Sequence, residues 1–126
     1  MKNRIIALVG MCGAGKTAVA DEFKKQDWAY VRLGQITLDE VKRRGLEPGE
    51  QNERPIREEF RAKHGMAAFA ILNFPKIDEA LETADVIVDG LYSWAEYKEF
   101  KNRYGEAFKV IAVYASPKTR YARLEN

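Results

Sequence analysis

The chain has 126 residues, of which 46% are hydrophobic and 32% are charged, and its formal net charge is +2. This composition is that of one globular domain and excludes a disordered chain. The balanced charge argues against a nucleic-acid or membrane partner. The single cysteine, Cys12, excludes an internal disulfide bond and indicates a reducing compartment. No apolar run approaches the roughly 20 residues that span a bilayer, and no secretory signal is present, so we expect a cytoplasmic protein.

In chain order, strand and helix patterns alternate. The first half of the chain predicts a strand, a helix, a strand and a short helix, at 4–10, 17–26, 29–33 and 38–44. The short helix depends on Thr37 and Glu40, whose spacing is that of a capping box. The polar stretch 46–55 is predicted to be a loop.

The second half continues the same alternation. It predicts helices at 57–65 and 66–74, an interruption at Pro75 before a helical stretch at 76–84, a strand at 85–90, a helix at 93–105 whose aromatic residues share one face, a strand at 108–115, and a last helix capped by Ser116. Strands that alternate with helices indicate an α/β fold with a parallel sheet of about four strands, in a single domain over residues 1–126.

A glycine-rich loop follows the first predicted strand and precedes a helix. Gly10, Gly15, Lys16 and Thr17 fill the pattern G-x-x-x-x-G-K-[ST], the P-loop or Walker A motif. Backbone N–H groups of such a loop point into one concavity, and the helix N-terminus adds partial positive charge. The whole loop is therefore a candidate ATP site: Gly10, Met11, Cys12, Gly13, Ala14, Gly15, Lys16 and Thr17. The alternative is a glycine-rich turn that binds nothing.

Two residues of this pattern suit Mg²⁺. The Thr17 hydroxyl is a metal ligand in P-loop proteins, and Asp89 ends the buried strand DVIVDG at the edge where α/β sheets bind ligands. Lys16 would neutralise the β- and γ-phosphates during transfer. The alternative for Asp89 is a turn aspartate that ends the strand.

These stretches carry a family resemblance. MKNRIIALVGMCGAGKTAVA resembles the opening of P-loop nucleotide kinases. The stretches VKRRGLEPGEQNERPIREEFRAKHGMAAFA, VIVDG and IAVYASPKTRYARL are similar to mostly archaeal P-loop proteins described as adenylate-kinase-related or dephospho-coenzyme-A-kinase-like. The resemblance implies a three-layer α/β/α P-loop fold and ATP-dependent phosphoryl transfer to a small acceptor. It also implies that Arg120 lies near the adenine and that Arg123 lies near the phosphates, as part of a lid; the alternative is a solvated basic helix face.

The sequence departs from the family pattern on the acceptor side. Leu38 and Tyr92 stand where nucleoside-monophosphate kinases carry arginines that hold the acceptor. The family also continues into an arginine-rich lid and a fifth strand, whereas this sequence ends at Asn126, so we expect a truncated or divergent form. A sheet without a fifth strand would expose an edge, which leaves a homodimer open.

Other arginines could bind the acceptor instead. Arg54, Arg57 and Arg61 are spaced by three and four positions, so one helix presents them as a stripe that suits phosphate. Glu58 and Glu59 lie among them, so a salt-bridged surface helix is the alternative.

The sequence thus predicts an ATP- and Mg²⁺-dependent kinase with a small acceptor. A nucleoside-monophosphate-like acceptor fits best, because the segment after the second strand lacks the carboxylate that would activate a hydroxyl. One alternative is a nucleotide-binding switch or sensor without kinase activity, and another is a P-loop domain that has lost its activity.

Overall fold

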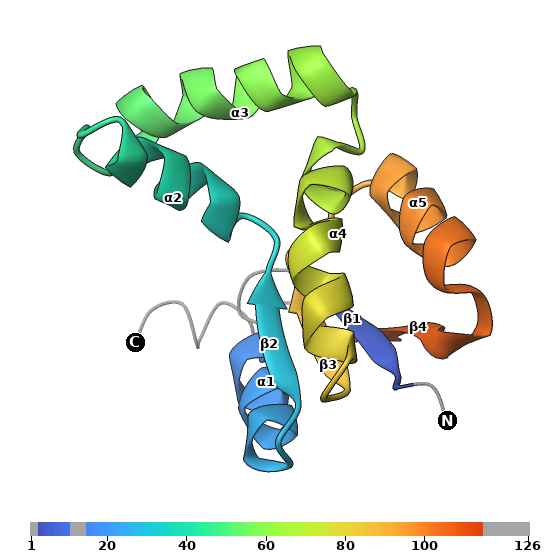
Figure 1. The fold of residues 1–126 in the computed structure, drawn as a ribbon. Coiled ribbons are helices and arrows are strands. Elements are labelled where there is room, and N and C mark those ends of the chain that lie inside the picture. Colours follow the sequence, from blue (N-terminus) through green and yellow to red (C-terminus); the bar gives the residue numbers. More distant parts are fainter. Residues whose placement is uncertain (1–2, 11–14, 115–126) are drawn as a thin grey trace.

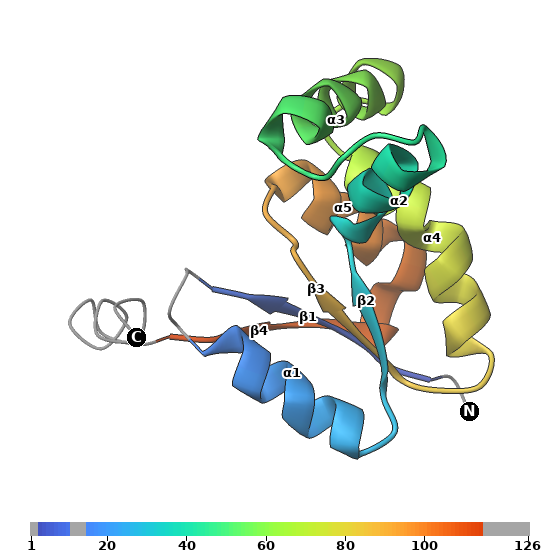
Figure 2. The same ribbon diagram turned by 90° about the vertical axis from the view of Figure 1, so that its left-hand side faces the viewer.

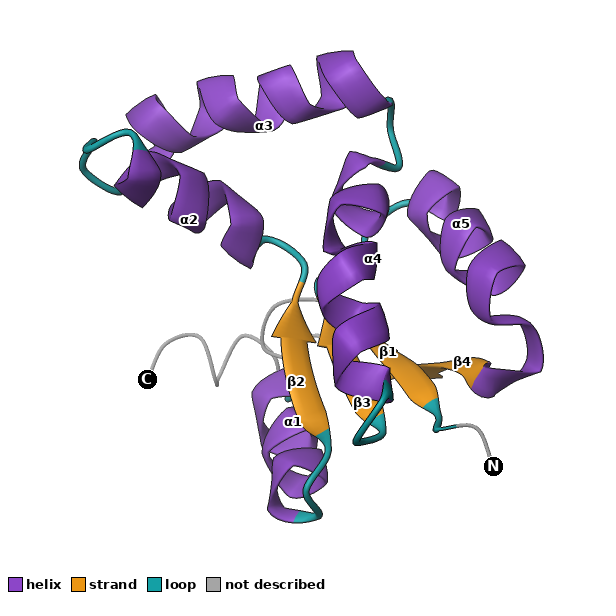
Figure 3. Ribbon diagram, in the orientation of Figure 1, coloured by secondary structure: helices purple, strands orange, loops and turns teal. Residues whose placement is uncertain are grey.

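The computed structural model describes residues 3–10 and 15–114. Its centre is a sheet of four parallel strands in the order β2-β3-β1-β4 (Figure 1; Figure 3). The strands are β1 (Ile5–Val9), β2 (Ala29–Arg32), β3 (Val86–Asp89) and β4 (Phe108–Ala112). All four strands predicted from the sequence are confirmed. The central strands β1 and β3 are mostly buried, as apolar runs in a parallel sheet usually are, whereas the edge strands β2 and β4 are more exposed.

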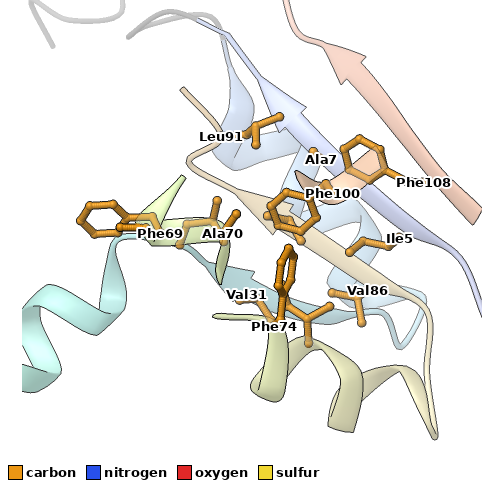
Figure 4. Close-up of a cluster of buried hydrophobic side chains, with 14 residues drawn as sticks. Ile5, Ala7, Val31, Phe69, Ala70, Phe74, Val86, Leu91, Phe100 and Phe108 are labelled. Atoms are coloured by element: carbon orange, nitrogen blue, oxygen red, sulfur yellow. The ribbon is translucent and has the colours of Figure 1, made fainter. Parts of the chain in front are cut away.

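Helices cover both faces of the sheet, so the predicted three-layer fold is confirmed. On one face, α1 (Lys16–Lys25) packs Ala20 against Leu8 of β1 and Ile87 of β3 (Figure 2). On the other face, α4 (Ala68–Leu81) and α5 (Trp94–Tyr104) enclose the larger core. Figure 4 shows its aromatic centre, where Phe74 meets Phe100 edge to face at 5.3 Å between ring centroids.

Two helices extend beyond the carboxyl ends of the strands. They are α2 (Gln35–Arg43), which follows β2, and α3 (Glu50–His64), which is drawn across the top of Figure 1. Ile56 of α3 is buried, and Phe60 meets Phe69 of α4 edge to face at 6.0 Å. These apolar contacts hold α3 over the edge of the sheet where parallel α/β folds bind ligands.

The predicted start of the helix after β2 is wrong. It begins at Gln35 after Gly34, and Thr37 lies inside its first turn rather than capping it. The Thr37 N–H donates to the Gly34 carbonyl at 3.1 Å, and the side chain is buried. The spacing of Thr37 and Glu40 matched a capping box, but burial of Thr37 against the domain places the helix start three residues earlier.

The loop predicted over the polar stretch 46–55 is too long, and the interruption predicted at Pro75 is wrong. Residues 50–55 belong to α3 rather than to a loop, and α4 continues through Pro75 without interruption. A proline within a helix removes one backbone hydrogen bond. Phe74 and Ile77, on either side of Pro75, are buried in the core, and this packing keeps α4 continuous.

The last described segment is a 3-10 turn, η1 (Gly105–Ala107), followed by β4. The helix predicted from Ser116 lies outside the described residues. The aromatic face predicted for α5 is only partly in the core: Phe100 is buried, whereas Trp94 is 69% exposed and stacks on Tyr97. No helix at residues 3–10 or 15–114 has the length and apolar character needed to cross a bilayer.

Candidate functional site

The site lies where the chain leaves β1 and β3 towards opposite faces of the sheet. These two strands are neighbours in the sheet, with Leu8 beside Asp89. After β1 the chain turns to α1 on one face, and after β3 it turns to α5 on the other (Figure 2). Such a divergence leaves a crevice at the carboxyl ends of the two strands, which is the usual ligand site of open α/β sheets. Lys16 and Asp89 both lie at this crevice.

The two described ends of the glycine-rich loop both require glycine. A Cβ atom on Gly10 would lie 2.7 Å from the Val113 carbonyl oxygen, so only glycine fits there. Gly15 has φ 98°, a conformation that favours glycine, and it directly precedes the ten-residue helix α1. Thr17 is exposed in the first turn of that helix. Met11, Cys12, Gly13 and Ala14, also predicted to hold nucleotide, lie outside the described residues.

Lys16 and Asp89 form an ion pair in the crevice. The Lys16 ammonium donates to Asp89 Oδ1 at 3.4 Å, and the side chains are 16% and 18% exposed. The Lys16 Nζ atom also donates to the Tyr92 hydroxyl at 3.3 Å. Burial lowers the pKa of Lys16, but the hydrogen bond to Tyr92 and the charge of Asp89 outweigh it, so the pKa is raised overall. Lys16 is therefore a fixed cation at the mouth of the loop.

Tyr30 is a further member of this cluster that the sequence did not suggest. Its hydroxyl donates to Asp89 Oδ2 at 2.8 Å, and burial together with this hydrogen bond raises the pKa of Tyr30 to about 12. No pattern in the sequence indicates this contact. It follows from strand pairing, because Tyr30 of β2 lies beside Ile87 of β3, two positions before Asp89. Both carboxylate oxygens of Asp89 thus have donors, which fixes the plane of the carboxylate.

A pocket of about 310 Å³ adjoins the crevice; we call it the α3 pocket. It is lined by Leu33, Gly34, Arg57, Arg61, Met66, Phe69, Gly90, Tyr92, Ser93 and Glu96, which come from the ends of β2 and β3 and from three helices. Its walls are largely apolar, and Arg57 and Arg61 supply positive charge. An apolar hollow with a few convergent charged groups is the usual form of a small-molecule site.

The structure separates the three arginines predicted to bind an acceptor. Arg57 and Arg61 line the α3 pocket, whereas Arg54 pairs with Glu58 at 3.1 Å on the exposed side of α3. Arg57 also forms an ion pair with Glu50, and Arg61 stacks its guanidinium over the Phe69 ring at 5.1 Å. Ion pairs with glutamate therefore hold Arg54 and Arg57, as in the salt-bridged alternative, while Arg57 and Arg61 also line the pocket.

A real capping box holds the segment after β3 in place. Ser93 Oγ accepts from the Glu96 N–H at 3.1 Å, and Glu96 Oε1 accepts from the N–H groups of Tyr92 and Ser93 at 3.2 and 3.1 Å. Glu96 is only 5% exposed although it is charged. The S-x-x-E spacing of Ser93 and Glu96 is visible in the sequence and would have found this cap. The cap fixes the backbone at Tyr92, between Lys16 and the α3 pocket.

The described residues suit a magnesium nucleotide. Within residues 3–10 and 15–114 there is no group of three or more acidic, histidine or cysteine side chains that could enclose a metal ion. Mg²⁺ needs no such cage, because it is usually held by one or two protein ligands together with phosphate oxygens and water. Thr17 and Asp89 would be those ligands, and the bound ion would neutralise phosphate charge. Arg120 and Arg123, expected near the nucleotide, lie outside the described residues.

Comparison with known proteins gives archaeal relatives. A UPF0200/UPF0201 protein of Archaeoglobus fulgidus is 34% identical over 126 residues, which cover 99% of this chain and 39% of the relative. UPF0200 proteins of Methanosarcina barkeri and Pyrococcus furiosus are 33% and 36% identical over 122 residues, covering 97% and 95% of this chain and 65% and 66% of the relatives. The chain thus spans 39 to 66% of the length of these three relatives. The resemblance to this archaeal group is confirmed.

Solved structures show the same fold at low sequence identity. Shikimate kinase from Bacteroides thetaiotaomicron matches with a TM-score of 0.51 and 22% identity, over 97% of this chain and 63% of that chain. TT1252 from Thermus thermophilus matches with a TM-score of 0.50 and 15% identity, over 98% of this chain and 72% of that chain. A family model described as AAA domain matches residues 6–126. The chain therefore belongs to this AAA-domain family, and its fold is that of P-loop kinases.

Proposed function

We propose that this chain is the catalytic domain of an ATP-dependent phosphotransferase that acts on a small anionic acceptor, with a nucleoside-monophosphate-like molecule as the best fit. The observation that carries the proposal is one juxtaposition. The Lys16–Asp89 pair, at 3.4 Å, lies at the mouth of the glycine-rich loop and shares Tyr92 with the arginine-bearing α3 pocket. A site for a triphosphate and a site for a second small molecule thus adjoin.

Each residue has a role in this proposal. The described part of the loop and the N-terminus of α1 bind the phosphates, Lys16 neutralises the charge that develops on them, and Thr17 with Asp89 holds Mg²⁺. Arg57 and Arg61 orient the anionic group of the acceptor. The helical hairpin of α2 and α3 holds these arginines over the edge of the sheet. In this proposal, alignment of the acceptor and neutralisation of phosphate charge provide most of the catalysis. Arg120 and Arg123 remain candidates for the nucleotide side.

A nucleotide-binding switch or sensor is the second candidate. Tyr92 replaces an expected acceptor arginine, and Leu38 lies away from the α3 pocket, against a separate hollow on the outer side of α2. A site with fewer cations for the acceptor favours nucleotide binding without efficient transfer. The two candidates differ in whether an acceptor accelerates ADP release.

The test combines binding and turnover. Mg-ATP should raise the melting temperature of the chain, because a ligand that binds only the folded state stabilises it. Lys16→Ala should abolish most of this stabilisation and reduce turnover by at least about a hundredfold, as loss of a charged group that contacts the transition state does. Lys25→Ala is the control, because Lys25 lies at the far end of α1, exposed and paired with Glu22.

A coupled ADP-release assay across nucleoside monophosphates and dephospho-coenzyme A then separates the candidates. Acceptor-dependent turnover supports the kinase. Mg-ATP binding with slow hydrolysis that no acceptor accelerates supports the switch. If Mg-ATP stabilised Lys16→Ala as strongly as the parent chain, the assignment of the glycine-rich loop would be wrong for both.

A further inference from the structure

Tyr92 contacts both halves of the site. Its hydroxyl accepts from the Lys16 ammonium at 3.3 Å, and Lys16 Nζ also lies 5.1 Å from the centre of the Tyr92 ring. The same residue lines the α3 pocket, opposite the arginines of α3. Its backbone is held by Glu96 at the start of α5, so the side chain projects from a fixed point.

The number of hydrogen-bond donors on Lys16 explains what this contact does. An ammonium group has three N–H donors, and Asp89 and Tyr92 each take one. These two partners lie at the end of β3 and in the segment that follows it, so together they limit the directions in which the ammonium can turn. The remaining donor is left for a phosphate oxygen. Without the Tyr92 hydroxyl, Lys16 would keep its contact with Asp89 at 3.4 Å but lose the one at 3.3 Å, and the ammonium would turn more freely.

The Tyr92 hydroxyl can also donate a hydrogen bond to a ligand. An oxygen that accepts from Lys16 still has its own proton to donate, and the nearby positive charge polarises it. A ligand in the α3 pocket would contact the same ring that holds Lys16. The tyrosine therefore does at this position something that an arginine would not, because a guanidinium cannot accept a hydrogen bond from lysine.

We propose that Tyr92 is a positioning residue, which holds the Lys16 ammonium beside Asp89 and connects the phosphate loop to the α3 pocket. The ring is 76% exposed, so its contacts contribute little to the folded core. The role of Tyr92 is therefore argued from its contacts in the site rather than from packing. This inference deepens the proposed function where it concerns nucleotide, but the contact with Lys16 is a property of the free protein.

The test compares Tyr92→Phe with Tyr97→Phe. The first removes the hydroxyl and keeps the ring; the second makes the same change on a tyrosine whose ring packs against Trp94 and Phe108. In the free protein at constant pH, NMR relaxation of the Lys16 ammonium should show a more mobile group in Tyr92→Phe than in the parent, because its contact with the Tyr92 hydroxyl is lost. Tyr97→Phe should leave the mobility of Lys16 as in the parent, and both variants should keep the parent melting temperature.

The second measurement is the affinity for a non-hydrolysable ATP analogue with Mg²⁺, by calorimetry. Tyr92→Phe should bind it about threefold to tenfold more weakly, which is the effect of losing one hydrogen bond, while Tyr97→Phe should bind as the parent does. An unchanged mobility of Lys16 in Tyr92→Phe, or an equal change in Tyr97→Phe, would overturn the proposal. If the parent chain bound no analogue, the proposed function would fail, and the mobility of Lys16 in the free protein would still decide the role of Tyr92.

Discussion

Each arginine along α3 has a different neighbour, and the neighbour decides what the arginine can do. Arg54 is turned to solvent and paired with Glu58, so its charge is already balanced. Arg57 is partly balanced by Glu50 but is only 27% exposed, at the α3 pocket. Arg61 lies over the Phe69 ring, which leaves its N–H groups at the edge of the guanidinium plane for a ligand. Helical spacing in the sequence therefore does not give the three arginines the same surroundings.

Arg57→Ala and Arg61→Ala are expected to raise the KM for the acceptor about tenfold to a hundredfold each. The reason is the loss of a charge-assisted hydrogen bond to an anion, worth about 1.5–3 kcal/mol. The affinity for Mg-ATP should stay within about twofold, because neither residue adjoins the phosphate loop. The measurement is ADP release as a function of acceptor concentration. Arg54→Ala is the matched control, and an equal rise of KM in that variant would remove the α3 pocket from the proposal.

At the scale of the elements, the ends of helices matter more than their middles for this site. The cap at the start of α5 uses a buried carboxylate to fix the two residues that border the α3 pocket, Tyr92 and Ser93. The start of α2 has no side-chain cap; Gly34 occupies the cap position. Of the two S/T-x-x-E patterns, the one at Ser93 thus forms an N-cap and the one at Thr37 does not, because the Thr37 side chain is buried inside the helix instead.

Ser93→Ala should lower the free energy of unfolding by about 1 kcal/mol, the usual cost of losing an N-cap. Thr37→Val should change it by less than about 0.5 kcal/mol or raise it, because the buried Thr37 Oγ1 has no hydrogen-bond partner among the described residues. Denaturant unfolding of both variants measures the two values. A cost for Thr37→Val as large as that for Ser93→Ala would mean that Thr37 does act as a cap.

At the scale of the whole molecule, ion pairs at the surface connect elements that are distant in sequence. Asp78 of α4 accepts hydrogen bonds from Arg103 and from Tyr104 of α5, the latter at 2.8 Å. Arg4, before β1, pairs with Asp85, before β3, at 2.9 Å. A local pairing is formed by Glu40 of α2 with Arg43 and with Arg44, which directly follows the helix. In each case the hydrogen bond from arginine is the main cause that lowers the pKa of the carboxyl group.

These lowered pKa values predict the acid response. A carboxyl group whose pKa is lower in the folded chain stabilises the fold above its ordinary pKa, and this contribution is lost as the pH falls through the folded value. Stability should therefore be level above about pH 5 and should fall below about pH 4, towards the pKa of about 2 for Glu40. Thermal melts from pH 7 to pH 2 measure the curve. Asp78→Asn should make the melting temperature fall less steeply between pH 4 and pH 2. An unchanged fall would exclude Asp78 as a contributor to the acid response.

The sequence by itself determined the strands, the α/β class and the phosphate loop, because these depend on local patterns. A short apolar run and the G-x-x-x-x-G-K-[ST] spacing before a helix can both be recognised without distant partners. The sequence also placed Asp89 at the useful edge of the sheet, since the carboxyl ends of parallel strands share one edge. The nucleotide side of the site was thus available from residues 10–17 and one aspartate.

Only the tertiary structure decided the features that depend on contacts between separate elements. It showed which arginines of α3 face the α3 pocket, that Tyr30 donates to Asp89, and that Tyr92 holds Lys16. It also showed α4 running through Pro75, because burial of its neighbours outweighs one lost hydrogen bond. The physical reason is common to all of these: each depends on side chains brought together by packing from separate elements, and no local pattern in the sequence encodes which face of a helix will meet which strand.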